Sequence, residues 1–201
     1  KDKITTNRSM IKKTFNDKGV DYASELVMKN VADLHKIIQW NEDNGIKFFR
    51  LSSEMFPWAS EYYQDWQKFP NIRFIHAMLS DCGKLANEYG HRLTAHPGPF
   101  NVLVSPNEDV VQNTITDLTI HADIMDFMGL SRTPYNKLNI HCNGVYGDKE
   151  SAMDRFCKNF ERLPESVQSR LTVENDDKAS MYSVKDLYEG IHKRIGIPIV
   201  F

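Results

Sequence analysis

Three residues that commonly ligate metals each close an apolar, strand-like segment of this chain. They are His96, His141 and Glu174, which end the segments RLTAH, KLNIH and LTVE. A single histidine after an apolar run is often only a core or loop residue. Three such endings together have a further explanation, because the carboxyl ends of parallel strands meet at one edge of a sheet. Imidazole and carboxylate ligands without a thiolate suit zinc, manganese or iron, so the pattern predicts a shared divalent-metal site.

Two kinds of reaction use a site of this composition. Clustered ions activate a water molecule and neutralise charge on a leaving oxygen, which suits hydrolysis of a phosphodiester. A sugar isomerase or epimerase uses a similar site to polarise a carbonyl group. The residue types alone leave both reactions open.

The elements that must position these residues alternate between helical and strand-like patterns. Helical periodicity begins at Ser24, where apolar residues recur with the spacing of one helix face, and Gly45 stops it. Three further helices are expected to end at Gly90, Gly129 and Gly196, and another is expected over about 150–162. The strand-like segments are 46–53, 92–96, 137–141, 171–175 and 197–201. Two serines, Ser105 and Ser183, stand where capping boxes would open helices.

Helical crossovers between strands indicate a parallel α/β fold. An open doubly wound sheet and a TIM (β/α)8 barrel both fit this alternation. No GxGxxG motif follows the first strand, and the polar residues collect at strand ends, so the barrel is favoured. A complete barrel needs about 250 residues, whereas this sequence has 201. We therefore expect residues 1–201 to form a single partial barrel domain with strands two to six, lacking the first strand and the C-terminal strands.

Composition excludes several classes of protein. The chain is 41% hydrophobic and 26% charged, which is typical of a globular protein rather than a disordered one. No apolar run is long enough to span a membrane, and the first residues contain no signal-peptide core. The net charge is −2, although residues 1–18 hold six basic and two acidic side chains. The three cysteines form no CxxC motif, which indicates an intracellular, reducing compartment, cytoplasmic or nuclear.

The loop after His96 has the sequence Pro97-Gly98-Pro99-Phe100. Its two prolines make it rigid, and it carries one aromatic ring at the expected mouth of the site. Such a ring is suited to wedge between stacked bases.

At these residues the sequence resembles the UV-damage endonuclease family of TIM-barrel DNA repair enzymes. The matching segments follow in the family's order, and they are TTNR (5–8), FFRLSSEMFPWAS (48–60), RLTAHPG (92–98), LNIHCNGVYGDK (138–149) and LTVENDD (171–177). The resemblance implies metal-dependent incision of UV-damaged double-stranded DNA, 5′ to the photoproduct. It also implies a divalent-metal cluster, of manganese or alternatively zinc, and no nucleotide cofactor.

The resemblance further implies roles for individual residues. His96, His141, Glu174 and Glu61 fall at metal-ligand positions, and His141 and Glu174 are the catalytic candidates. Glu61 departs from the family pattern, which has a histidine there.

The expected DNA contacts are Asn7, Arg8, Arg50, Pro99 and Phe100. Pro99-Phe100 replaces the Gln-Tyr pair that the family inserts opposite the lesion. The leading hypothesis is thus a repair endonuclease, and the alternatives are a sugar isomerase of similar fold and a non-catalytic DNA-binding fragment.

Overall fold

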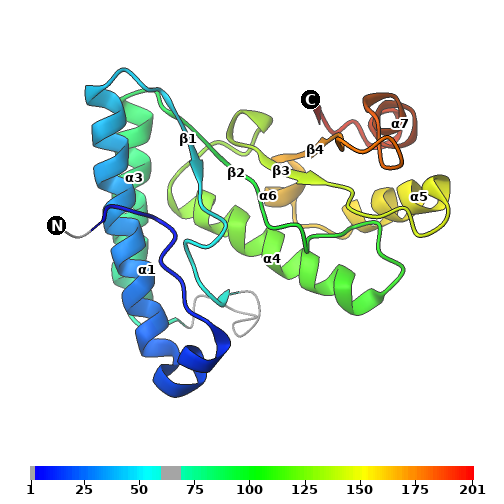
Figure 1. The fold of residues 1–201 in the computed structure, drawn as a ribbon. Helices are drawn as coiled ribbons and strands as arrows, with labels where there is room; N and C mark the ends of the chain where they lie inside the picture. Colours follow the sequence, from blue (N-terminus) through cyan, green and yellow to red (C-terminus); the bar gives the residue numbers. More distant parts are fainter. Residues whose placement is uncertain (1–2, 60–68) are drawn as a thin grey trace. The chain divides into compact units, whose positions relative to one another are not determined.

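A computed structural model describes residues 3–59 and 69–201 of the chain (Figure 1). The chain divides into two compact units. Unit 1 comprises Lys1–Ala95 and Asp123–Ser131, and unit 2 comprises His96–Ala122 and Arg132–Phe201. No helix within the described ranges is long and apolar enough to cross a membrane.

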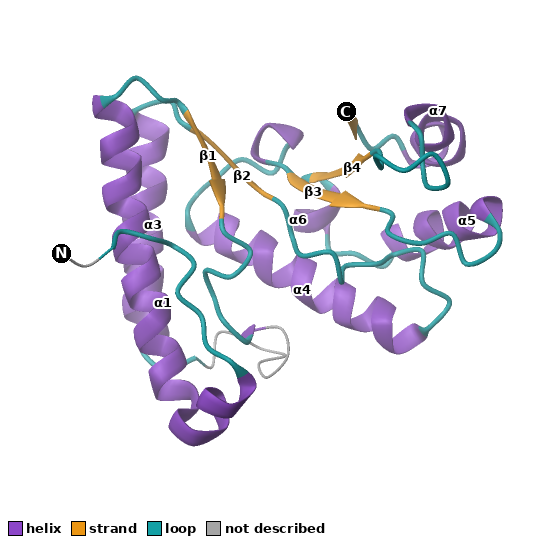
Figure 2. Cartoon of the chain, in the orientation of Figure 1, coloured by secondary structure: helices purple, strands orange, loops and turns teal. Residues whose placement is uncertain are grey.

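The described part of unit 1 consists of two long helices and two short parallel strands (Figure 2). Its elements are α1 (Lys12–Asp43), β1 (Phe48–Leu51), α3 (Ile72–Glu88) and β2 (Arg92–Ala95). Helices α1 and α3 pack against each other through their buried apolar faces. At Gly83 of α3 the backbone of Met128 comes so close that an added Cβ would lie 1.6 Å from its carbonyl oxygen. Only glycine permits this contact.

Unit 2 contains three parallel strands and several short helices. Its elements are η2 (Pro134–Asn136), β3 (Leu138–His141), α5 (Lys149–Phe160), α6 (Glu165–Gln168), β4 (Leu171–Glu174), α7 (Val184–Leu187), η3 (Tyr188–His192), α8 (Lys193–Ile195) and β5 (Ile199–Val200). Strand β4 pairs with β3 on one side and β5 on the other. Helix α4 (Glu108–Phe127) contributes to both units. The parallel strands and helical connections confirm the α/β class expected from the sequence.

Glycines end helices where the sequence predicts. Gly45 and Gly90 have φ values of 71° and 67°, the left-handed region in which glycine is least strained. The residue after each glycine then donates a backbone hydrogen bond back to the last helical turn, over 2.8 Å in both cases. These turns direct the chain into β1 and β2.

Helix starts follow the sequence less closely. The capping box at Ser183 is confirmed, with Asp186 making the reciprocal contact. The box expected at Ser105 is wrong by two residues, because Asn107 accepts the hydrogen bond from Asp109 N–H and α4 begins at Glu108. Helix α1 begins at Lys12 rather than near Ser24, with a kink at Gly19, so its first turns lie in a segment without apolar periodicity.

Candidate metal centre

Strand register in unit 2 brings His141 and Glu174 together. The two residues are paired neighbours at the carboxyl ends of β3 and β4. His96 reaches the same place, with its Nε2 3.3 Å from Glu174 Oε2, while His141 Nε2 lies 3.9 Å from that oxygen. All three side chains are partly exposed, between 27% and 31%. The convergence predicted from the strand endings is therefore present in the structure.

The separation of the ligand atoms fits a single divalent ion. One nitrogen or oxygen from each of His96, His141 and Glu174 lies within 4.8 Å of the others. Two ligands about 2.1 Å from one ion are at most about 4.2 Å apart, so the two nitrogen–oxygen distances agree with shared coordination. Imidazole nitrogens with a carboxylate oxygen are a donor set for zinc, manganese or iron. The three residues can thus hold a metal.

Two buried side chains, those of Asn139 and Thr172, hold Glu174 in place through consecutive hydrogen bonds. Asn139 donates its side-chain amide to Glu174 Oε2, and Thr172 Oγ donates to Asn139 Oδ1 over 2.7 Å. Asn139 is 6% exposed and Thr172 only 1%. Because Oε2 already accepts this amide, the carboxylate is held in a fixed orientation. The same oxygen faces both histidines, so the amide orients the oxygen that would serve as the metal ligand.

Asn139 and Thr172 were not identified from the sequence. Each lies two residues before a ligand candidate, Asn139 before His141 and Thr172 before Glu174. Alternate residues of a strand face the same side of the sheet, so this spacing could have indicated them. The signal was available but requires knowing which strands are neighbours.

The second nitrogen of His141 also has a carboxylate near it. His141 Nδ1 is 3.8 Å from Asp176 Oδ1, too long for a hydrogen bond but close enough for an electrostatic contact. Ligating histidines commonly present their other nitrogen to a carboxylate, which fixes the ring. Cys142, next in the chain, is buried, and burial with the nearby Asp176 raises the pKa of its thiol far above the usual range. It therefore remains a neutral thiol, in agreement with a site built without thiolates.

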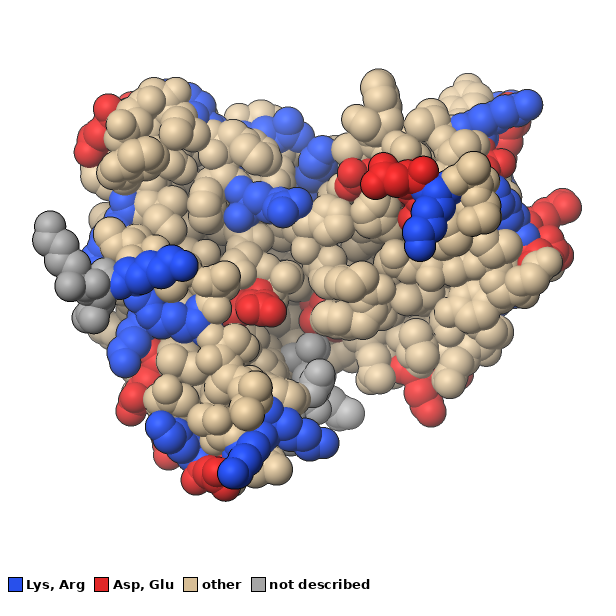
Figure 3. Space-filling view, viewed as in Figure 1, with Lys and Arg blue, Asp and Glu red and all other residues tan. Residues whose placement is uncertain are grey.

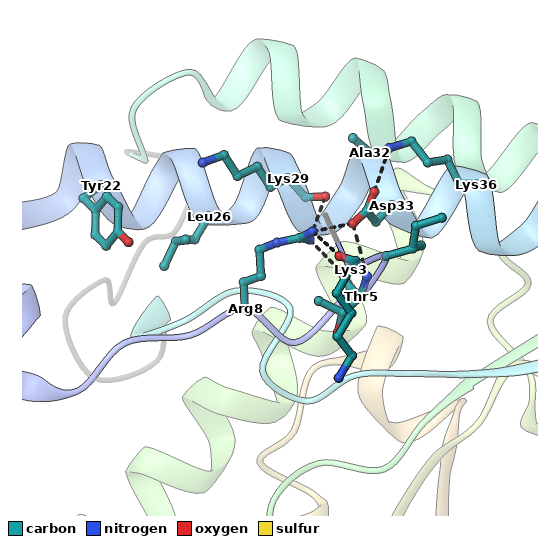
Figure 4. A pocket seen from close by; sticks show the side chains of 10 residues that line it. Lys3, Thr5, Arg8, Tyr22, Leu26, Lys29, Ala32, Asp33 and Lys36 are labelled. Carbon is teal, nitrogen blue, oxygen red and sulfur yellow. Dashed lines mark hydrogen bonds and ion pairs between the residues drawn. The ribbon is translucent and has the colours of Figure 1, made fainter. Parts of the chain in front are cut away.

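Arg8, an expected DNA contact, is engaged within unit 1. Its guanidinium binds Asp33 Oδ2 at 2.6 Å and donates to the carbonyl oxygens of Thr5 and Lys3 (Figure 4). Burial alone would raise the pKa of Asp33, but hydrogen bonds from Lys36 and Arg8 outweigh it and hold that pKa below its usual value. Arg8 thereby ties the segment before α1 to the middle of that helix.

This ion pair forms part of a pocket of about 550 Å³ in unit 1. The pocket is lined mainly by basic and polar side chains, including Lys3, Lys29 and Lys36. Figure 4 shows the Lys36 ammonium directed at Asp33 and the Lys29 ammonium away from it. In the space-filling view, basic side chains are scattered over the face around α1 (Figure 3).

The remaining expected residues occupy several places. Asn7 and Arg50 are exposed in unit 1, and Pro99 and Phe100 are exposed in the loop after His96 in unit 2. Phe100 is 60% exposed, so its ring faces solvent. Glu61 lies outside the described residues.

Comparison with known proteins gives one consistent result. The family model described as UV-endonuclease UvdE matches residues 2–201. The UV-damage endonuclease of Schizosaccharomyces pombe is 38% identical over 203 residues, which is 100% of this chain and 33% of that protein. The UV DNA damage endonuclease of Clostridium perfringens is 32% identical, over 98% of this chain and 45% of its own length.

A solved structure agrees in fold. The crystal structure of SacUVDE superposes with a TM-score of 0.85 at 32% identity, covering 98% of this chain and 63% of that one. The parallel strands, their helical connections and the residues gathered at strand ends define an α/β protein of the TIM-barrel type. The chain belongs to the UV-endonuclease UvdE family, as its motifs predicted. It spans about a third to a half of the length of the two curated relatives named here.

Proposed function

We propose that this protein is a metal-dependent DNA repair endonuclease that cleaves UV-damaged double-stranded DNA on the 5′ side of the lesion. The observation that carries the proposal is the convergence of His96, His141 and Glu174 within 4.8 Å, in a chain of the UvdE family. A phosphodiester suits such a site, because a divalent cation can offset the negative charge of the phosphate. No observation favours the sugar isomerase.

The proposed metal ligands are the two histidines and Glu174, with Glu61 as a further candidate. When bound, a divalent ion supplies Lewis-acid chemistry, activating water and stabilising charge on the phosphate oxygens. Manganese is the proposed ion and zinc the alternative. Asn139 holds Glu174 in place, and Asp176 favours the tautomer of His141 that carries its proton on Nδ1 and leaves Nε2 free to bind.

The proposed DNA contacts fall into two groups. Phe100 and Pro99 follow a ligand directly, and the exposed ring of Phe100 is suited to enter the duplex. Extrusion of the damaged nucleotides then takes less energy than extrusion of intact ones, because the lesion has already weakened pairing and stacking. Asn7 and Arg50 are exposed and remain candidates for backbone contacts. Arg8 is also a proposed contact, and its ion pair with Asp33 fixes the position of its guanidinium.

We also propose that residues 1–201 contribute strands two to six of one (β/α)8 domain. The five parallel strands of the described residues are in keeping with this assignment.

A nicking assay tests the function. UV-irradiated and untreated supercoiled plasmid are incubated with the protein, in manganese or in excess chelator. We expect relaxation of the irradiated plasmid only, and only with metal. Equal nicking of both plasmids, or none with metal present, would contradict the proposal.

The position of the cut needs a defined substrate. On an end-labelled duplex with one thymine dimer, the product should map to the 5′ side of the dimer and carry a 3′-hydroxyl. His141→Ala should abolish this product, whereas His192→Ala should retain it. His192 is a matched control, because it lies in the same unit and its ring binds the Ile197 carbonyl instead of a carboxylate.

A further inference from the structure

The loop between β3 and α5 holds an aromatic residue in an unusual backbone conformation. Tyr146 has a φ of 51°, and Asn143 in the same loop has a φ of 62°. Asparagine tolerates the left-handed region, but a bulky side chain rarely adopts it. Backbone strain of this kind persists only where the surrounding structure imposes it, and it is found most often at functional sites.

Buried contacts impose the conformation of this loop. Tyr182, which is fully buried, donates its hydroxyl to the Gly144 carbonyl oxygen over 2.6 Å. The Tyr146 ring lies directly on Gly144, where an added Cβ would come within 2.6 Å of the ring. Although the ring contacts Gly144, it is not buried, since Tyr146 is 51% exposed. The loop therefore presents an aromatic face to solvent.

The loop after His96 repeats this arrangement. The Phe100 ring lies on Gly98, where an added Cβ would be 2.4 Å from the ring, and the residue is 60% exposed. Each of the two rings thus sits on a glycine two residues before it, in a loop that directly follows one of the candidate metal ligands.

The two loops are joined to each other. Asn143 donates its side-chain amide to the Asn101 carbonyl oxygen over 3.4 Å. Arg155 donates Nε to the Val104 carbonyl oxygen over 2.7 Å, and its guanidinium carbon lies 5.7 Å from the centre of the Tyr146 ring. The guanidinium thus steadies the ring and places a positive charge beside it.

We propose that Tyr146 is a DNA-contacting residue that stacks on a nucleobase, as a second aromatic contact beside Phe100. This inference rests on the proposed function and assigns a further binding residue to the same site. A water-facing ring on a strained backbone gains little in the free protein, whereas every nucleobase offers it a flat partner. The nearby positive charge of Arg155 adds attraction toward the phosphates.

The test measures binding of a fluorescent duplex carrying one thymine dimer, by anisotropy, with chelator present to prevent incision. Tyr146→Ala should raise Kd at least about fivefold, the smallest effect expected for a lost base stack. Tyr146→Phe keeps the ring and should bind like the wild type. Tyr188→Ala should also bind like the wild type, although Tyr188 is 46% exposed with Lys193 over its ring, because it belongs to η3 and to neither of the two loops.

A second variant separates binding from folding. Tyr146→Gly relieves the left-handed backbone and should be at least as stable to heat as the wild type, while binding as weakly as Tyr146→Ala. A 2-aminopurine base beside the dimer should lose its change in fluorescence on binding with both variants.

The results of these experiments distinguish a failure of the Tyr146 proposal from a failure of the proposed function. If the wild type nicks irradiated plasmid but Tyr146→Ala binds equally well, only the role of Tyr146 is wrong. Weak binding by Tyr146→Phe would also overturn it, since the hydroxyl and not the ring would then matter. A wild type that leaves irradiated plasmid intact would overturn the proposed function itself.

Discussion

Asp33 in unit 1 and Glu174 in unit 2 are both carboxylates surrounded by nitrogen atoms, but the nitrogen atoms differ in kind. Asp33 receives the Thr5 N–H, the Arg8 guanidinium and the Lys36 ammonium, and its side chain is 6% exposed. Glu174 faces two imidazoles and one amide, and its side chain is 31% exposed. Permanent cations saturate the first carboxylate, while the second is surrounded by groups that can also bind a metal.

The difference separates a structural cluster from a site that is open to a ligand. A carboxylate whose oxygens accept hydrogen bonds from cationic groups of the protein contributes to stability. Its oxygens are then occupied and bind a further ligand poorly. A carboxylate that is oriented by one amide and lies beside two imidazoles can coordinate an ion. Substitutions in unit 1 should therefore alter stability, and substitutions at the Glu174 cluster should alter metal binding and activity.

The largest expected effect is that of Glu174→Gln on activity. Loss of the carboxylate removes an anionic ligand, and metal assistance provides several kcal/mol of transition-state stabilisation, so the nicking rate should fall about a thousandfold or more. Measurement of nicking rate and bound metal per chain checks this prediction. Full activity with unchanged metal content would place the metal elsewhere.

Asp33→Ala should have the next largest effect, on stability. The substitution leaves Arg8 without its partner, and hydrogen bonds to charged groups contribute about 1.5–3 kcal/mol, so the free energy of unfolding should fall by about 2–3 kcal/mol. Urea denaturation measures the change. Asp21→Ala is the control, because Asp21 is exposed on the same helix, and it should leave stability unchanged. A loss of metal binding in Asp33→Ala at full stability would erase the contrast between the two clusters.

Asn139→Ala should weaken metal binding without removing a ligand. Residues that orient metal ligands typically contribute about 10- to 100-fold in affinity, and metal titration followed by calorimetry would detect a change of that size. Thr172→Val acts one step further from the ligand, through Asn139, and should produce a smaller loss in the same direction. An Asn139→Ala protein with wild-type metal affinity would show that Glu174 needs no support.

The smallest expected effect is the change in the free energy of unfolding as the pH is lowered. Because the pKa of Asp33 is lowered in the folded protein, its contribution is complete above the unfolded value of 3.8 and is lost as the pH falls through the lower folded value. One proton changes stability by at most about 1.4 kcal/mol per pH unit. Unfolding of the wild type and Asp33→Ala from pH 5 to pH 2 should show a shallower slope in the variant. Parallel slopes would mean that Asp33 is not specially stabilised as a carboxylate.

Much of this protein follows from its sequence because the signals are local. Gly45 and Gly90 end helices through their own backbone freedom, and the Ser183 box needs only the next three residues. The triad also follows, since His141 and Glu174 each end a strand and parallel strands align their ends. The helix start predicted at Ser105 was wrong because Asn107, two residues later, is an equally good N-cap residue.

Tertiary structure decided what each polar residue does. Arg8 is a proposed DNA contact from the sequence, and the fold adds an ion pair with Asp33, 25 residues away, that the sequence did not indicate. Asn139 becomes a support for Glu174 only because β3 and β4 are neighbours, and the loop that carries Tyr146 is held at Gly144 by Tyr182 from a later segment. The sequence by itself determined most of the elements and the family, and it indicated the candidate ligands. The partners of those residues depend on contacts between distant segments, which no local pattern encodes.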